Sequence, residues 1–328
     1  MLKVSAPGKC ILLGEHAVVY GHPALAVSIN MRLNVNISKQ KVESEFHVVN
    51  GELMKSKNHP HIINALDDIW SNEDQMLNFN ISSEIPPSAG LGSSAALSVA
   101  IATGLIKAKN MNKNLEDISS IAHKFEANAQ GGLASPMDTS TSTHGGCILL
   151  ANQKLGENWL YSRTMGEKKW EIHSYELHEK MKNASIVIGH TGIHGSTAEM
   201  VQGVKKRLEE NSNLMNEIDA INALTKRGVI AIENGNLEAL GAVMNLNHSH
   251  LQNLGVSCKE LDELVSAARE TSLGAKLTGS GGGGCMIALS MNPKETARDI
   301  ELAGGRSYIC KFGVEGVKIE EDSIDFHN

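Results

Sequence analysis

The chain has 328 residues, of which 41% are hydrophobic, 20% charged and only 4% aromatic. This composition is typical of a soluble globular protein, and the length suits two domains better than one core. The formal net charge of −7 argues against nucleic acid and anionic membranes as partners.

The five cysteines are scattered and form no CxxC pair, which indicates reduced thiols in a cytoplasmic protein. The N-terminal segment MLKVSAPGKCILLGEH contains no long apolar run, and nowhere do about 18 apolar residues follow one another. We therefore expect neither a signal peptide nor a transmembrane helix.

The first part of the chain is predicted to be rich in strands, because runs of Val, Ile and Leu alternate with turn residues. Asn50-Gly51 indicates a hairpin, and residues 61–70 are a helix candidate. The expected strands are residues 3–6, 10–20, 24–40 and 77–85. Breaks are expected at Pro7-Gly8, Gly14 and Gly21-His22-Pro23.

After residue 93 most apolar residues recur three and four positions apart, which predicts helices. Strands are expected at residues 147–151 and 184–192, on both sides of a glycine loop within 275–290, and in the last segments 307–313 and 317–322. The expected helices are residues 93–109, 115–128, 196–210, 215–233, 236–252 and 258–270. The pattern favours an α+β protein with domains at 1–180 and 181–328 and a cleft between them.

The stretch PPSAGLGSSAAL, residues 86–97, predicts a tight loop that opens a helix. The prolines exclude helix before the loop, Gly90 and Gly92 allow close backbone approach, and Ser93 and Ser94 can cap the helix. A helix start with unpaired N–H groups is an anion site, although a capped helix without a ligand explains the stretch as well. The prolines argue against a dinucleotide fingerprint, and no GxxxxGK[ST] loop is present.

Three further segments carry candidate chemistry. KLTGSGGGGC, residues 276–285, has more glycines than a structural loop needs, which favours close approach of its backbone to a ligand. A flexible hairpin tip remains the alternative. Lys9, Glu15 and His16 stand in an apolar setting where buried charges need partners, or they are ordinary surface charges. Asp138, in ASPMDTSTSTHGG, is on its own best interpreted as a turn aspartate.

The segments PGKCILLGEH, PPSAGLGSSAA and KLTGSGGGGC together resemble, in order and spacing, the motifs of the GHMP kinases. This family comprises galactokinase, homoserine kinase, mevalonate kinase and phosphomevalonate kinase. GEHAVVYGHPALA is similar to the mevalonate kinase branch, whereas a galactokinase would continue Gly-Glu-His with Thr-Asp-Tyr. A homoserine kinase lacks the lysine and the aspartate, and phosphomevalonate kinases more often have Gly-Glu-Tyr.

The resemblance implies the two-domain GHMP fold, with an N-terminal domain like domain 2 of ribosomal protein S5 and a ferredoxin-like C-terminal α/β sandwich. It implies transfer of phosphate from ATP, with Mg²⁺, to the 5-hydroxyl of mevalonate, giving 5-phosphomevalonate. Relatives are often homodimers. Phosphomevalonate kinase, another small-molecule kinase of this fold and a nucleotide-binding regulator without catalysis remain the alternatives.

The resemblance also implies roles for individual residues. Asp138 would accept the hydroxyl proton, and Lys9 beside it would keep the aspartate ionised. Glu15 and His16 would complete the mevalonate site, and Ser94 and Glu126 would hold Mg²⁺. The ATP-binding residues would be Pro87, Ser88, Ala89, Gly90, Leu91, Gly92, Ser93, Ser94, Ala95, Thr197, Gly279, Ser280, Gly281 and Gly282.

Two departures from the family pattern qualify this assignment. Glu126 and Asp138 are twelve positions apart, one more than the family spacing, and Leu97 stands where some relatives have tyrosine. A zinc site is disfavoured, because the glycines around His190 and His194 argue against a helix that would place both on one face. His248 and His250 are expected on a helix surface.

Overall fold

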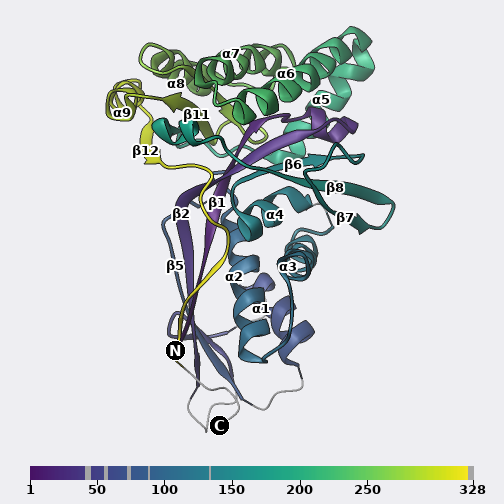
Figure 1. The fold of residues 1–328 in the computed structure, drawn as a ribbon, viewed down its shortest axis with the longest axis vertical. Helices are drawn as coiled ribbons and strands as arrows, with labels where there is room; N and C mark the ends of the chain where they lie inside the picture. The colour runs from purple at the N-terminus through teal and green to yellow at the C-terminus, as the bar shows by residue number, and fades with distance from the viewer. Residues whose placement is uncertain (41–45, 55–57, 72–74, 88, 133, 324–328) are drawn as a thin grey trace.

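The computed structural model describes residues 1–40, 46–54, 58–71, 75–87, 89–132 and 134–323. These residues form two β-sheets with helices packed on each, which confirms the α+β class. In Figure 1 the strands β1, β2 and β5 run beside the helices α1 to α4, and α6 to α9 gather around the second sheet at the opposite end. No helix in these ranges is long and apolar enough to cross a membrane.

The first sheet is built around the sixteen-residue strand β2, which pairs with β1 on one side and with β6 and β5 on the other. The short strands β3 and β4 form the expected hairpin, with Asn50 and Gly51 at positive φ. The strands of this sheet are β1 (Leu2–Leu13), β2 (Ala24–Lys39), β3 (Val48–Val49), β4 (Glu52–Leu53), β5 (Leu77–Ser83), β6 (Cys147–Ala151), β7 (Trp159–Met165), β8 (Lys168–Tyr175) and β13 (Lys318–Asp322).

The expected break at Pro7-Gly8 is wrong, because β1 continues through it. The pairing of β1 with β2 shifts register between Pro7 and Gly8, so the two residues form an irregularity within the strand. The breaks at Gly14 and at residues 21–23 are confirmed, but residues 17–20 form a single 3₁₀ turn, η1 (Ala17–Tyr20), in place of a strand. As a result, Lys9 stands on the sheet, and Glu15 and His16 lie just beyond its end.

In the described part of the chain, α2 (Ser93–Ala108) and α4 (Pro136–His144) pack on strands of the first sheet. The helix α3 (Leu115–Ala129) packs on both of them, and α1 (Pro60–Ala65), which continues as the π-helical turn η2 (Leu66–Trp70), packs on α2 and α3. Asn114 caps α3 in a capping box with Asp117. The apolar α2 lies in the core, which includes Val99, Ile101 and Leu105. Ser135 caps α4 and Pro136 opens it, so Asp138 lies in the first turn of a helix and the turn interpretation is wrong.

The second sheet has the strand order β10-β11-β9-β12, so β10 is an edge strand. Its strands are β9 (Ser185–His190), β10 (Gly274–Thr278), β11 (Cys285–Ser290) and β12 (Arg306–Cys310). Its helices are α5 (Thr197–Glu210), α6 (Met215–Glu233), α7 (Leu237–Asn253), α8 (Lys259–Arg269) and α9 (Pro293–Leu302). The short turns η3 (Glu179–Asn183) and η4 (Ser212–Leu214) precede β9 and α6. All the expected helices of this part are confirmed within two residues, and α9 had not been anticipated.

The chain end returns from the second sheet to the first, where β13 pairs antiparallel with β1. Residues 311–317, the connecting segment, join β12 to β13 and pass the end of α4, where Gly145 pairs with Glu315. The first sheet therefore contains strands from both the N-terminal and the C-terminal parts of the chain. The division into 1–180 and 181–328 stays a prediction.

Candidate active site

A cavity of about 690 Å³ lies between the two halves of the chain, within the size range of small-ligand sites. Its walls come from β1, η1, the glycine loop before α2, α3, α4, α5 and the loop between β10 and β11. The predicted site residues that line it are Lys9, Glu15, His16, Pro87, Ala89, Gly90, Leu91, Gly92, Ser93, Ser94, Glu126, Asp138, Thr197, Gly279 and Ser280. Ala95, Gly281 and Gly282 do not line it, and Ser88 lies outside the described residues.

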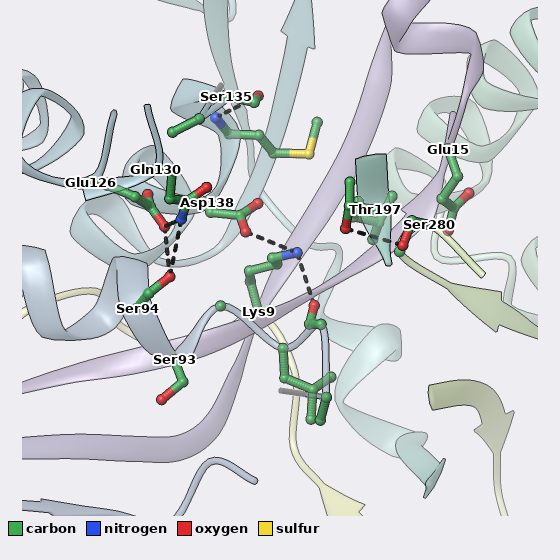
Figure 2. Close-up of a pocket in the computed structure, with 18 of the residues that line it drawn as sticks. Lys9, Glu15, Ser93, Ser94, Glu126, Gln130, Ser135, Asp138, Thr197 and Ser280 are labelled. Carbon is green, nitrogen blue, oxygen red and sulfur yellow. Dashed lines mark hydrogen bonds and ion pairs between the residues drawn. The ribbon is translucent and has the colours of Figure 1, made fainter. Parts of the chain in front are cut away.

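Lys9 and Asp138 form an ion pair at the centre of the cavity, with Lys9 Nζ 3.1 Å from Asp138 Oδ2 (Figure 2). Lys9 Nζ also donates to the Gly90 carbonyl at 3.0 Å, and the Lys9 side chain is 5% exposed against 31% for Asp138. The surface-charge alternative is therefore wrong for Lys9. A carboxylate open to the cavity, with a fixed ammonium beside it, is suited to accept a proton from a bound hydroxyl.

The glycine loop approaches β1 closely, because the Lys9 amide donates to the Leu91 carbonyl at 2.9 Å. Gly92 has φ +76°, and a Cβ there would lie 3.0 Å from Lys9 Cγ, so a side chain would disturb the lysine. The predicted serine cap is wrong, because the N-cap residue of α2 is Gly92, which has no side chain to cap the helix. The first amides of α2 therefore remain available to an anion.

Ser94 turns instead towards α3, where its hydroxyl donates to Glu126 Oε1 at 2.8 Å. Gln130, the C-cap residue of α3, donates to the same oxygen at 3.2 Å (Figure 2). Glu126 Oε2 is buried without a partner in the described residues. Burial, and then repulsion from Asp138, raise the pKa of the Glu126 carboxyl to about 7. Glu126 therefore contacts Ser94, as the resemblance implied, although it lies twelve positions before Asp138.

This pair of residues fits a nucleotide-borne Mg²⁺, which takes one or two protein oxygen ligands and completes its shell with phosphates and water. The unpartnered Glu126 oxygen and the adjacent Ser94 hydroxyl offer that donor set. In the described part of the chain no three His, Cys, Asp or Glu side chains gather into a metal cluster.

Glu15 and His16 lie at the other end of the cavity, and both are buried, so they are not surface charges. Glu15 forms an ion pair with Lys276 and accepts a hydrogen bond from Asn247 at 3.3 Å. Burial raises the pKa of Glu15, whereas the contact with Lys276 opposes that shift. His16 Nε2 lies 2.9 Å from the Ser280 carbonyl, and burial lowers the pKa of the imidazole.

The glycine-rich loop between β10 and β11 is packed against its neighbours, so it is not a flexible hairpin tip. The Gly282 amide donates to Val256 and the Gly284 amide to Ile193, both at 2.8 Å. Gly279 and Ser280 face the cavity, and the Thr197 hydroxyl donates to Ser280 Oγ at 3.2 Å. Figure 2 shows Thr197 and Ser280 across Lys9 from the group of Ser94, Glu126 and Gln130.

Comparison with known proteins places this site in a family. Residues 56–146 match the N-terminal domain of the GHMP kinases and residues 229–309 match their C-terminal domain. The mevalonate kinase of Pyrococcus furiosus is 35% identical, with 97% of this chain and 98% of that protein covered. The chain belongs to the GHMP kinases, in the mevalonate kinase family.

Other relatives of this GHMP kinase agree. The mevalonate kinase of Methanothermobacter thermautotrophicus is 35% identical, with 87% of this chain and 88% of that protein covered. The crystal structure of the Methanococcus jannaschii mevalonate kinase superposes with a TM-score of 0.77 at 27% identity, covering 94% of this chain and 97% of that chain. The two-domain GHMP fold expected from the sequence is thereby confirmed.

Several residues of the kinase site were not found from the sequence. Gln130 follows Glu126 by four positions and caps the end of the same helix, a spacing that could have revealed it. His61, which lines the cavity and lies 3.0 Å from Ser98 Oγ, offers no such signal. Lys276 was included in the glycine motif, but its pairing with a glutamate 261 positions earlier depends on the fold.

Proposed function

We propose that this kinase transfers the γ-phosphoryl group of ATP to the 5-hydroxyl of (R)-mevalonate and releases 5-phosphomevalonate and ADP. The observation that carries the proposal is the ion pair of Lys9 and Asp138, which faces the cavity between the α2 N-terminus and Glu15. Phosphoryl transfer asks a protein mainly for positioning and for charge neutralisation, and this arrangement supplies both.

In the proposed reaction the 5-hydroxyl oxygen attacks the γ-phosphorus, the bond from that phosphorus to the β,γ-bridging oxygen breaks, and ADP leaves. Asp138 accepts the hydroxyl proton, and Lys9 holds the aspartate in place and stabilises the negative charge of the attacking oxygen. The free amides of α2 hold phosphate oxygens, and Thr197 lies near the γ-phosphate. Gly279 and Ser280 close the site from the second sheet.

Ser94 and Glu126 are the residues that would hold Mg²⁺ in the complex with the nucleotide. When bound, Mg²⁺ supplies neutralisation of the charge on the phosphate oxygens. Gln130 and Ser94 orient the Glu126 carboxylate through the two hydrogen bonds to Oε1.

The charges of the cavity favour mevalonate over phosphomevalonate. A phosphorylated substrate needs Lys or Arg side chains for the phosphate that it already carries. Among the described residues that line the cavity, Lys9 is the one Lys or Arg, and it is already paired with Asp138. A homodimer and a cytoplasmic location, both expected from the sequence, stay predictions.

The test is ADP release from Mg-ATP with mevalonate, 5-phosphomevalonate, galactose and homoserine offered separately. We expect turnover with mevalonate and background rates with the other three. Turnover with phosphomevalonate alone would contradict the proposed substrate and leave phosphoryl transfer intact. Background rates with all four would overturn the proposal.

A further inference from the structure

The face of β10 that looks towards the first sheet is polar, although all of β10 is buried. Alternate residues of a strand point to opposite faces, so Lys276 and Thr278 share one face and Ala275 and Leu277 the other. Ala275 and Leu277 belong to the apolar core of the second sheet. Thr278 contacts β1: its hydroxyl accepts a hydrogen bond from the Ile11 amide and donates one to the Ile11 carbonyl, both at 3.0 Å.

Lys276, on the same polar face of β10, is fully buried between the two sheets. Its Nζ contacts Glu15 Oε1 and donates to the Leu277 carbonyl at 2.5 Å. Glu15 itself is 2% exposed, and its other oxygen accepts the Asn247 amide. A buried charge is strongly destabilising unless it is paired, so each of these two ions requires the other.

Side chains of the helix α7 hold both β10 and Glu15 in place. Asn245 accepts the Ala275 amide at 2.9 Å and His248 accepts the Leu277 amide at 3.2 Å, so α7 side chains take the place of a neighbouring strand along the β10 edge. Asn247 on the same helix points its amide at Glu15. The expectation that His248 lies on a helix surface is wrong, since it is 1% exposed.

We propose that Lys276 is a positioning residue that neutralises Glu15 and holds its carboxylate at the cavity wall, so that an anionic hydroxy acid can bind beside it. This inference rests on the proposed function, because mevalonate carries a carboxylate. Without Lys276, Glu15 either stays ionised and repels that carboxylate, or takes up a proton and loses the contact that holds it at the cavity wall. Asn247 assists by fixing the second oxygen of Glu15. The second sheet thereby sets the charge of a substrate-binding group that belongs to the first half of the chain.

The test compares Lys276→Met with the matched control Thr278→Val, which removes a contact with β1 from the same face of β10 but does not touch Glu15. We expect Lys276→Met to raise the KM for mevalonate by about tenfold or more while the KM for ATP is unchanged. Thr278→Val leaves both KM values as in the wild type. Asn247→Ala keeps the ion pair and gives a smaller rise in the KM for mevalonate.

Because Lys276→Met leaves a lone buried carboxylate, it is also combined with Glu15→Gln. The double variant removes both charges, and we expect it to unfold at a higher temperature than Lys276→Met alone. An unchanged KM for mevalonate in Lys276→Met, or equal effects of Lys276→Met and Thr278→Val, would overturn the inference. Failure of the wild type to phosphorylate mevalonate would instead overturn the proposed function.

Discussion

Asp138 is the residue on which the proposed chemistry depends most directly. Asparagine keeps the size and the contact with Lys9 but cannot accept the hydroxyl proton. We expect Asp138→Asn to lower kcat by about 10²- to 10⁴-fold, the usual contribution of a general base. The affinity for nucleotide, measured by calorimetry without mevalonate, is expected to stay close to that of the wild type. A variant with the wild-type kcat would show that another group takes the proton.

Glu126 and Ser94 are expected to act on the nucleotide through Mg²⁺. Ser94→Ala removes one oxygen ligand and Glu126→Gln replaces a charged carboxylate with a neutral amide. We therefore expect both to weaken nucleotide binding in the presence of Mg²⁺ and to raise the Mg²⁺ concentration needed for half-saturation. The measurement is a calorimetric titration of nucleotide over a series of Mg²⁺ concentrations.

Binding of nucleotide in excess chelator provides the internal control for both variants. We expect it to change little, because the proposed contacts of the α2 amides with the phosphates do not involve the metal. If the Mg²⁺ dependence of either variant equals that of the wild type, that residue is not a ligand.

At the scale of elements, the connecting segment fastens the end of α4 to the first sheet. The Val317 amide donates to the Thr143 carbonyl at 3.1 Å, and the Gly146 amide donates to Val314 at 2.9 Å. Arg32 donates to the carbonyls of Glu315 and Gly316 at 3.0 and 2.7 Å. Since α4 carries Asp138, these bonds also hold the proposed base in place.

Gly145 and Gly146 provide a matched pair for testing this joint. Both have positive φ, but a Cβ at Gly145 would lie 2.3 to 2.6 Å from backbone atoms of residues 314–316, whereas one at Gly146 meets nothing within 4 Å. Gly146→Ala carries only the strain of the left-handed conformation, about 1 kcal/mol. We expect Gly145→Ala to lower the free energy of unfolding by more than about 2 kcal/mol, because the clash adds to that strain.

Urea unfolding of the two variants measures the difference. Equal destabilisation would mean that the connecting segment moves away without cost and does not fasten α4.

The elements also show what the sequence could predict. Regular signals gave correct elements: the three- and four-residue spacing of α2, the Asn50-Gly51 turn, and the apolar runs of β9 and β11. The hairpin of β7 and β8 was not anticipated, because apolar and polar residues are mixed along both strands and no local pattern of the sequence encodes the pairing of β8 with β6. The helix α4 was missed for a similar reason: Thr and Ser residues with weak helix propensity are buried by the surrounding fold.

For the candidate site, short segments were predictable and long-range partners were not. Lys9, the glycine loop and Asp138 stand in recognisable motifs, so their presence in one cavity could be expected. The contacts of Glu15 with Lys276 and of Ser94 with Glu126 join residues from separate elements, and no local pattern encodes them. The burial of Lys276 and His248 could not be predicted either, because it depends on the tertiary structure.

At the scale of the whole molecule, burial keeps two histidines neutral in the folded state. Burial, followed by the charge of a nearby arginine, lowers the pKa of both His144 and His248 from 6.5 to about 4. The hydrogen bonds of His248 also require a neutral imidazole. Its Nδ1 accepts the Leu277 amide and so carries no proton, which leaves the one proton on Nε2, 3.1 Å from Asp262. His144 Nε2 lies 3.0 Å from the Tyr161 hydroxyl.

These shifts predict the direction in which stability changes with pH. Between about pH 6.5 and pH 4 the unfolded chain binds protons at both histidines and the folded chain does not, so the free energy of unfolding rises with pH in this window. The stabilisation is complete above pH 6.5 and is lost as the pH falls towards 4. Glutamine at both positions can accept and donate in the manner of neutral histidine but does not titrate. Urea unfolding of the wild type and of the double variant His144→Gln/His248→Gln across this window measures the effect, and we expect a smaller slope in the variant. Equal slopes would mean that other groups cause the loss of stability in acid and that these two histidines are protonated in the folded protein.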